Sequence, residues 1–269
     1  MLETVPGTTI FAMIFSLVLA LGAPVLAAVL MKLKANGKLI CTLIGIAAFV
    51  VFALILEQLC HILVARLAGE SLMDNQVFYA VYGGLSAAVF EETGRFLAMK
   101  FLMRKNLTQE NSIMYGIGHG GAESILLIIV SFLPNLMTSV MINNGGMQEA
   151  LGAVDATVRE ETVQELSVLW TTPSAEFALA GIERVLSFVL QLCLSYLVYL
   201  AVRYKKPGYY FLAMALHFTI DALTVPLRAV MSIYMAETIF LGYVLVIAFF
   251  TIRKYRREKA ETGDGEYLV

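Results

Sequence analysis

All three histidines of the chain lie inside long apolar runs, and each has a carboxylate four residues away. The three pairs are Glu57 with His61, His119 with Glu123, and His217 with Asp221. Glu91 and Arg95 have the same spacing. Residues four apart share one face of a helix, and a lone charge at the centre of a bilayer costs about 2.5 kcal/mol or more. The pattern therefore predicts a functional polar cavity inside a membrane rather than four unrelated structural pairs.

The ionisable residues fall at two expected depths, counted at about 1.5 Å per residue from the ends of the apolar runs. The group in the middle slab is Glu91, His119, His217 and Asp221. The group nearer the outer face is Glu57, His61, Glu183 and Arg184. We expect the first group to be the reactive one. The second is expected to be structural, with Arg184 as a counter-charge for Glu57 or Glu183.

Glu91 and Glu92 are adjacent in "EETGR" and differ by about 100° around a helix. We therefore expect that they do not both point into one cavity. One should face the site while the other pairs elsewhere, with Arg95 as its partner. Glu91 is the expected reactive carboxylate, and Glu92 is the alternative.

A buried glutamate, two histidines and a second carboxylate on three helices provide a general base and groups that stabilise an oxyanion or bind a metal. This combination suits the attack of water on an amide. The sequence contains no HExxH motif. A zinc site is therefore expected only in a distributed form, with His119, His217 and either Glu91 or Asp221 as ligands and water in the fourth position. A metal-independent site is the alternative.

The composition identifies the class of protein that must position these residues. The chain has 269 residues, of which 59% are hydrophobic and 15% charged, and its mean hydropathy is +0.78. A soluble domain has about a quarter charged residues. We expect an all-α fold, a polytopic transmembrane helix bundle of about seven spans (seven or eight) that forms one domain over residues 1–269, with no nucleic-acid partner. The expected helices are 8–31, 39–66, 77–103, 111–138, 174–202, 208–225 and 230–252.

The basic residues mark one side of the membrane. They gather in "KLKANGK", "MRKN", "RYKKPG" and the tail at 253–269, whereas the intervening segments are acidic or neutral. The positive-inside rule predicts an N-terminus outside and a C-terminus inside the cell, in the plasma membrane. The extracytoplasmic loop at 143–173 is expected to contain an amphipathic surface helix over 149–169.

Three motifs in order, "EETGR", "YGIGHGG" and "HFTID", resemble those of the CAAX-protease and bacteriocin-processing superfamily. The closer similarity is to its YhfC-like branch of intramembrane peptidases, and it extends over the whole chain, including "GIERVLSF". The resemblance implies an intramembrane endopeptidase in which Glu91 with His119 activates water and His217 with Asp221 stabilises the oxyanion. Glu92 and Arg95 belong to the same motif, and Glu123, Glu183 and Arg184 are expected to support the site.

Two departures separate this chain from the prenyl-protein proteases of the superfamily. Arg95 follows the glutamate pair after two residues instead of three, so its role is expected to differ. Asp221 stands where those proteases have asparagine. An ionised aspartate would repel an oxyanion, so Asp221 is expected to be protonated, to orient His217 or to bind a metal.

Two other classes of function fit the same buried charges. One is a proton- or cation-coupled transporter or channel, and the other is a non-catalytic membrane scaffold or immunity protein. The implied substrate of a peptidase is a membrane protein or a lipidated peptide.

Overall fold

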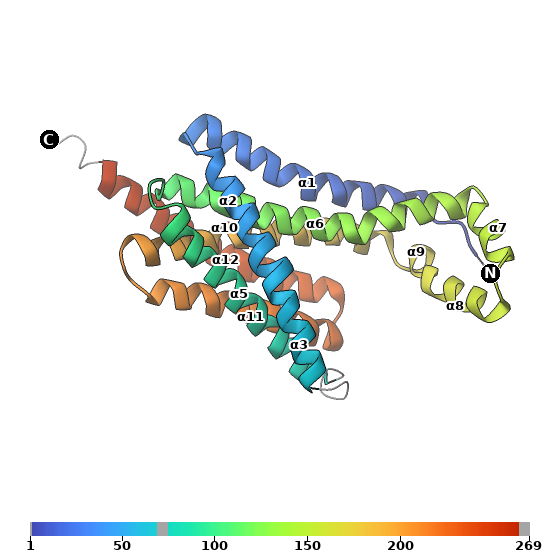
Figure 1. Ribbon diagram of the computed structural model, residues 1–269. Coiled ribbons are helices and arrows are strands. Elements are labelled where there is room, and N and C mark those ends of the chain that lie inside the picture. The colour runs from blue at the N-terminus through green and yellow to red at the C-terminus, as the bar shows by residue number, and fades with distance from the viewer. Residues whose placement is uncertain (1, 69–74, 264–269) are drawn as a thin grey trace. The chain divides into compact units, whose positions relative to one another are not determined.

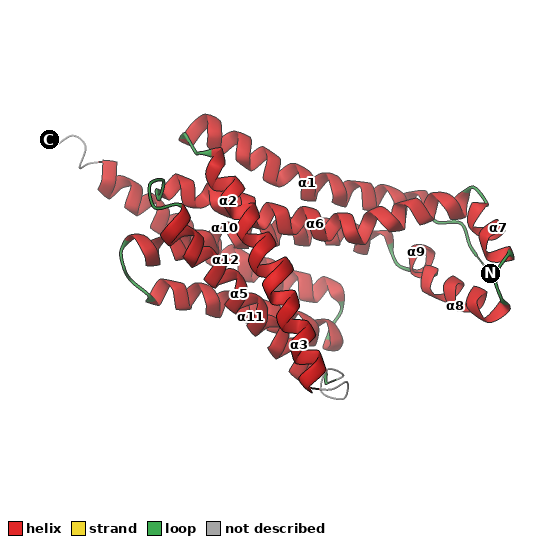
Figure 2. Cartoon of the chain, in the orientation of Figure 1, coloured by secondary structure: helices red, strands yellow, loops and turns green. Residues whose placement is uncertain are grey.

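The computed structural model describes residues 2–68 and 75–263. Within these ranges every regular element is a helix and no strand is present (Figure 1, Figure 2). The predicted all-α class is therefore confirmed. Most of the acidic loop between the second and third expected helices lies outside the described residues, as does the end of the basic tail.

Each of the seven expected membrane helices is present, and their ends lie within five residues of the prediction except at the last helix, which was expected to end at 252 and continues to Gly263. In chain order they are α1 (Gly7–Ala35), the continuous run of α2 (Leu39–Phe49), η1 (Val50–Glu57) and α3 (Gln58–Ala68), α5 (Gln76–Leu97) with η2 (Ala98–Leu102), α6 (Gln109–Asn143), α10 (Ser174–Arg203), α11 (Gly208–Val230) and α12 (Ile233–Gly263). Six of the described helical runs, all of these except α5, are long and apolar enough to span a membrane. α5 is less apolar because it contains Glu91, Glu92 and Arg95.

Two segments, η1 and η2, have π-helical turns. Such turns are rare and are often found at functional sites. Phe52 of η1 lies directly over Gly94 of α5, because a Cβ atom at Gly94 would be 2.5 Å from the Phe52 ring. The missing side chain therefore lets η1 pack against the part of α5 that carries the acidic pair.

The segment between α6 and α10 differs from the prediction of one helix over 149–169. It contains three short helices, α7 (Gly146–Gly152), α8 (Ala156–Leu166) and α9 (Val168–Thr171). Arg159 of α8 donates hydrogen bonds to the carbonyls of Leu151 (2.8 Å) and Val154 (3.2 Å). These bonds satisfy carbonyls in the last turn of α7 and in the segment that follows it, and they stabilise the break in the helix.

By its contacts the chain divides into two compact units, Met1–Ala23 with Ser124–Val185, and Pro24–Glu123 with Leu186–Val269. In the first unit, Met13 and Ala20 pack with Ile128 and Phe132. The second unit contains every residue of the reactive group predicted from the sequence. The single domain over 1–269 stays a prediction.

Large apolar side chains on most helices are exposed, including Phe11 (70%), Leu67 (78%) and Phe211 (61%). This is the surface expected of a protein whose solvent is lipid. α10 differs, because 67% of its most apolar stretch is buried inside the protein. α10 is therefore an interior helix with neighbours on most sides.

α12 continues to Gly263, whereas the last expected helix ends at 252 and is followed by the basic tail at 253–269. Glu258, which is 3% exposed, accounts for this difference. Its carboxylate accepts hydrogen bonds from the hydroxyls of Tyr196 (2.5 Å), Tyr199 (2.7 Å) and Tyr204 (2.6 Å). These three bonds fasten the end of α12 to α10 and to the residue that follows it.

Candidate active site

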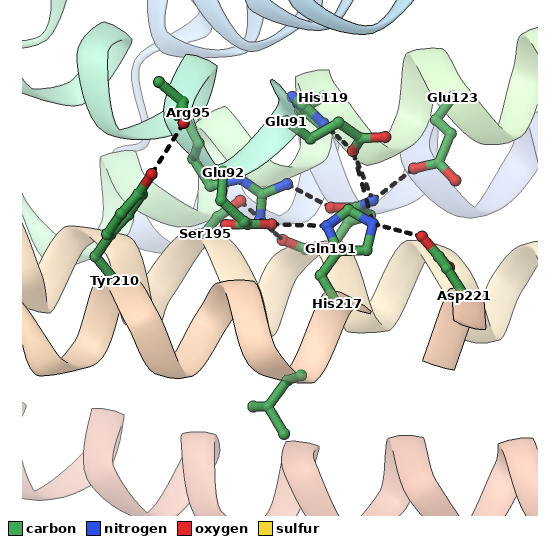
Figure 3. Close-up of polar contacts among 12 residues, drawn as sticks. Glu91, Glu92, Arg95, His119, Glu123, Gln191, Ser195, Tyr210, His217 and Asp221 are labelled. Carbon is green, nitrogen blue, oxygen red and sulfur yellow. Dashed lines mark hydrogen bonds and ion pairs between the residues drawn. The ribbon is translucent and has the colours of Figure 1, made fainter. Parts of the chain in front are cut away.

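The acidic pair of α5 is buried with its arginine. The side chains of Glu92 and Arg95 are 0% exposed, and that of Glu91 is 9% exposed. Helix α5 begins at an N-cap, where the Asn75 side chain accepts hydrogen bonds from the backbone of the first turn. From this helix Glu91 reaches α6, whereas Glu92 reaches α11 (Figure 3).

Glu91 meets His119 of α6. Glu91 Oε2 lies 2.8 Å from His119 Nε2, and the histidine side chain is 1% exposed. The imidazole is held between two rings, Phe49 edge-on with centroids 5.3 Å apart and Tyr115 stacked at 5.9 Å. His119 therefore has a fixed orientation toward the carboxylate.

The glycines of "GIGHGG" explain how α6 comes so close to its neighbours. A Cβ atom at Gly118 would overlap the backbone carbonyl of Thr42 in α2. On another face, a Cβ atom at Gly116 would lie 2.8 Å from the Ser195 hydroxyl, and one at Gly120 would lie 2.5 Å from the Gln191 side chain of α10. Small residues let membrane helices approach closely, and here they set the position of His119.

His217 of α11 is held on both ring nitrogens. Its Nδ1 lies 2.9 Å from Glu92 Oε1, and its Nε2 lies 3.3 Å from Asp221 Oδ2 and 4.0 Å from Glu91 Oε2. Arg95 Nη1 is 3.6 Å from the same Glu92 oxygen. Both glutamates therefore approach the His217 ring, Glu92 at hydrogen-bonding distance and Glu91 at 4.0 Å, while Glu91 makes its short contact with His119 instead. The expected pairing of the second glutamate with Arg95 is confirmed.

Gln191 of α10 connects the cluster, and sequence reasoning missed it. Its amide nitrogen donates to Glu91 Oε2 (3.1 Å) and to Glu123 (2.7 Å), and its amide oxygen accepts a short hydrogen bond from Arg95. The Arg95 guanidinium also donates to the Gln191 carbonyl (3.3 Å). The sequence signal that could have identified Gln191 is its position, a polar amide in the middle of the apolar run "FVLQLCLSY".

The remaining predicted residues are distributed as follows. Glu123 joins the cluster through Gln191. His61 contacts Glu57 at 3.4 Å, as the spacing predicted. Arg184 pairs with Glu183 at 2.7 Å, within the other unit of the chain.

The cluster contains the donor types that zinc prefers, two imidazoles and several carboxylates. However, among residues 2–68 and 75–263 no three His, Cys, Asp or Glu side chains are arranged to hold a metal ion. The His119 Nε2 and His217 Nδ1 atoms already lie against Glu91 and Glu92. As they stand, the predicted ligands His119, His217, Glu91 and Asp221 do not form a three-ligand metal site.

Comparison with known proteins gives two matches. The family model described as YhfC intramembrane metalloprotease matches residues 15–246, a range that includes the whole cluster. The chain is also 31% identical over 230 residues to a protein of Bacillus subtilis (strain 168) described as "Uncharacterized membrane protein YhfC", with 84% of this chain and 88% of that protein covered. No solved structure matches. The resemblance to the YhfC-like branch is thereby confirmed.

Proposed function

Because the chain belongs to the YhfC intramembrane metalloprotease family, we propose that it hydrolyses a peptide bond within or next to the membrane. In this proposal Glu91 with His119 activates the attacking water, and His217 stabilises the oxyanion. The observation that carries the proposal is the 2.8 Å contact between Glu91 Oε2 and His119 Nε2, in a region where both side chains are almost fully buried.

The hydrogen bonds around Glu91 leave one of its oxygens free to act. Both hydrogen bonds that the described residues make with this carboxylate, from His119 and Gln191, end on Oε2, and so does the longer ion pair with His217. Oε1 is then the oxygen that accepts a proton from water. A general base must lie within hydrogen-bonding reach of the proton that it removes, and a water bound at Oε1 meets this condition.

The proposed reaction has two stages. As the water oxygen forms a bond to the carbonyl carbon, its proton moves to Glu91 and negative charge develops on the carbonyl oxygen. A hydrogen bond from protonated His217 Nε2 stabilises that charge. The carbon–nitrogen bond then breaks, and Glu91 returns the proton to the leaving amine.

Glu92 and Arg95 act behind His217 as positioning residues. Glu92 accepts the hydrogen bond from His217 Nδ1 and is itself held by Arg95. A carboxylate on one ring nitrogen fixes the orientation and the tautomer of the ring. This arrangement directs Nε2 toward Glu91 and Asp221. The family description implies a metal, but the predicted ligands do not form a three-ligand site, so every step is assigned to side chains of the protein.

The membrane setting of the proposal follows from sequence and surface together. Six described helices are able to span a bilayer, and the alternation of basic and acidic segments supports an N-terminus outside the cell and a cytoplasmic C-terminus. The proposed substrate is a membrane protein or a lipidated peptide, since it must reach a site between buried helices.

The test compares cells that produce the wild type with cells that produce Glu91→Gln at equal abundance. Glutamine preserves the shape of the side chain but cannot accept the proton. We expect a membrane protein to accumulate uncut with the variant, and its fragments to disappear from the membrane proteome. Glu237→Gln is the matched control, because Glu237 is a 9% exposed carboxylate of α12 that pairs with Arg228.

Unchanged cleavage by folded Glu91→Gln would overturn the assigned base. If no substrate of the wild type appears under several growth conditions, while purified protein in liposomes moves protons or cations, then the buried charges serve transport and the proposal is wrong.

A further inference from the structure

A partly open pocket of about 410 Å³ lies beside the cluster, with walls from α3, α5 and α11. Its lining includes His61, Tyr79, Tyr82, Gly83, Asp221 and Val225. Pockets that bind ligands have volumes of about 300–1,000 Å³. The pocket is therefore large enough for one amino-acid side chain and part of its backbone.

Asp221 connects this pocket to the proposed chemistry. It lines the pocket and lies 3.3 Å from His217. Its side chain is 37% exposed, whereas those of Glu91, Glu92, His119 and His217 are at most 9% exposed. Figure 3 shows Asp221 at the edge of the cluster, beyond the His217 ring. A molecule in the pocket can thus touch Asp221 and lie next to the reacting groups.

The opposite wall is fixed by contacts that the proposed reaction does not use. Tyr82 Oη lies 2.7 Å from His61 Nδ1, and His61 Nε2 lies 3.4 Å from Glu57. The ring of Tyr82 also stacks on Phe78, with centroids 5.8 Å apart. The outer pair that the sequence presented as structural therefore holds an aromatic side chain at the pocket.

The chemistry of the lining favours a cation. The pocket contains the Asp221 carboxylate and the rings of Tyr79 and Tyr82, and no lysine or arginine is among the described residues that line it. A carboxylate attracts a positive charge directly, and aromatic faces attract ammonium and guanidinium groups.

We infer that this pocket binds a lysine or arginine side chain of the substrate next to the scissile bond, and that Asp221 is the residue that selects it. The inference rests on the proposed peptidase function. It also explains the departure at position 221. An ionised aspartate beside His217 would repel the oxyanion, but a bound basic side chain offsets that charge.

The first experiment measures the charge preference of the pocket without any cleavage. Gly83 is suited to a cysteine probe, because a Cβ atom there meets nothing within 4 Å. Gly83→Cys is made in a Cys60→Ser background, where the remaining cysteines, Cys41 and Cys193, are buried. Labelling rates are measured with a cationic reagent, methanethiosulfonate ethyltrimethylammonium, and with an anionic one, methanethiosulfonate ethylsulfonate. Each rate is divided by the rate at which the same reagent reacts with a free thiol in solution.

The quantity compared is the ratio of the cationic to the anionic labelling rate. We expect this ratio to be at least about tenfold higher at Gly83→Cys than at Gly242→Cys, since one nearby unit charge supplies this much discrimination. Gly242 is the matched control, a glycine of α12 with open space around it. Adding Asp221→Asn should bring the ratio close to that of the control. Equal ratios at the two positions, or no labelling of Gly83→Cys, would overturn the inference.

The second experiment measures specificity on a degenerate peptide library in detergent, with cleavage sites read by mass spectrometry. The wild type should cut next to lysine or arginine. In Asp221→Asn the ratio of cleavage next to lysine to cleavage next to norleucine should fall at least about tenfold. Gly83→Leu should fill the pocket and suppress cleavage, whereas Gly242→Leu should not. Normal cleavage by Glu91→Gln would contradict the proposed function. An active wild type that does not prefer lysine or arginine next to the cleaved bond would contradict only this inference.

Discussion

Glu91 and Glu92, adjacent in the chain, approach opposite nitrogens of one imidazole ring. Glu92 Oε1 lies 2.9 Å from Nδ1 of His217, and Glu91 Oε2 lies 4.0 Å from Nε2. The two carboxylates diverge from α5 by about 100°, and His217 lies between them. The same acidic pair can therefore provide a base on one side and a positioning group on the other.

Glu92→Gln tests the positioning role. It removes the charge that orients His217 Nδ1, so we expect kcat to fall about 10–100-fold, as for other partners of a functional histidine, with little change in KM. The variant should retain its fold, because glutamine still accepts a hydrogen bond. Glu237→Gln is the control. A larger effect on KM than on kcat would place Glu92 in substrate binding instead.

Gln191→Leu tests the connecting amide. The change removes a hydrogen-bonding partner from Arg95, Glu91 and Glu123 at once, and a buried polar group such as Arg95 or Glu91 that is left unsatisfied costs about 1–3 kcal/mol. We expect a clear fall in the thermal midpoint of unfolding in detergent. Leu192→Ala, one residue away, gives the cost of an ordinary truncation in α10. An unchanged midpoint for Gln191→Leu would mean that these three groups find other partners.

Gly118→Ala tests the close packing of α6 on α2. The added methyl group would overlap the Thr42 carbonyl, so the helices must separate and His119 must move away from Glu91. We expect loss of activity and a lower thermal midpoint. Gly242→Ala, which meets no atom within 4 Å, should be neutral or stabilising by about 0.5–1 kcal/mol, since alanine favours helix over glycine. Equal behaviour of the two variants would contradict the packing described here.

Metal content tests the mechanism directly. Because Glu91 and Glu92 already engage the two imidazoles, we expect active protein to contain far less than one zinc per chain and to keep its activity after treatment with a chelator. Near-stoichiometric zinc that is lost in His119→Ala and His217→Ala, together with activity, would show that these side chains rearrange around a metal.

Glu258→Gln tests the attachment of the α12 end. The three tyrosine hydroxyls donate to a carboxylate, and hydrogen bonds to charged groups contribute about 1.5–3 kcal/mol each. We expect trypsin to cut the variant faster at Arg253–Arg257 than the wild type. Glu261→Gln, at an exposed position of the same helix, should not change the rate. Equal cutting of wild type and Glu258→Gln would refute the attachment.

The same attachment should depend on pH at its one phenol outside the candidate spans. The hydrogen bond to Glu258, together with burial, raises the pKa of Tyr204 to about 12. A raised pKa in the folded state means that the folded protein binds the proton more tightly. Its contribution to stability is therefore complete below the ordinary phenol pKa of about 10 and is lost as the pH rises through 12. Tyr204→Phe should remove this dependence in denaturation curves.

Local sequence determined the class of protein and its seven long helices, and it predicts the slab in which the reactive group lies. Apolar runs report span length, and positions counted along a helix report depth, so both can be obtained without knowing how helices pack. The pairs Glu57 with His61 and His217 with Asp221 also followed from spacing alone, because their contacts lie within one helix.

Tertiary structure decided which partners the other residues take. His119 has a carboxylate four residues away in its own helix, yet it contacts Glu91 of α5. Arg95 pairs with Glu92 in its own helix, as expected, but it also contacts Gln191 of α10. Periodicity defines the face of a helix but not its rotation against its neighbours. That rotation depends on where neighbouring helices can approach closely, at Gly94, Gly118 and Gly120, and it places Gln191 in the cluster and Asp221 at the pocket.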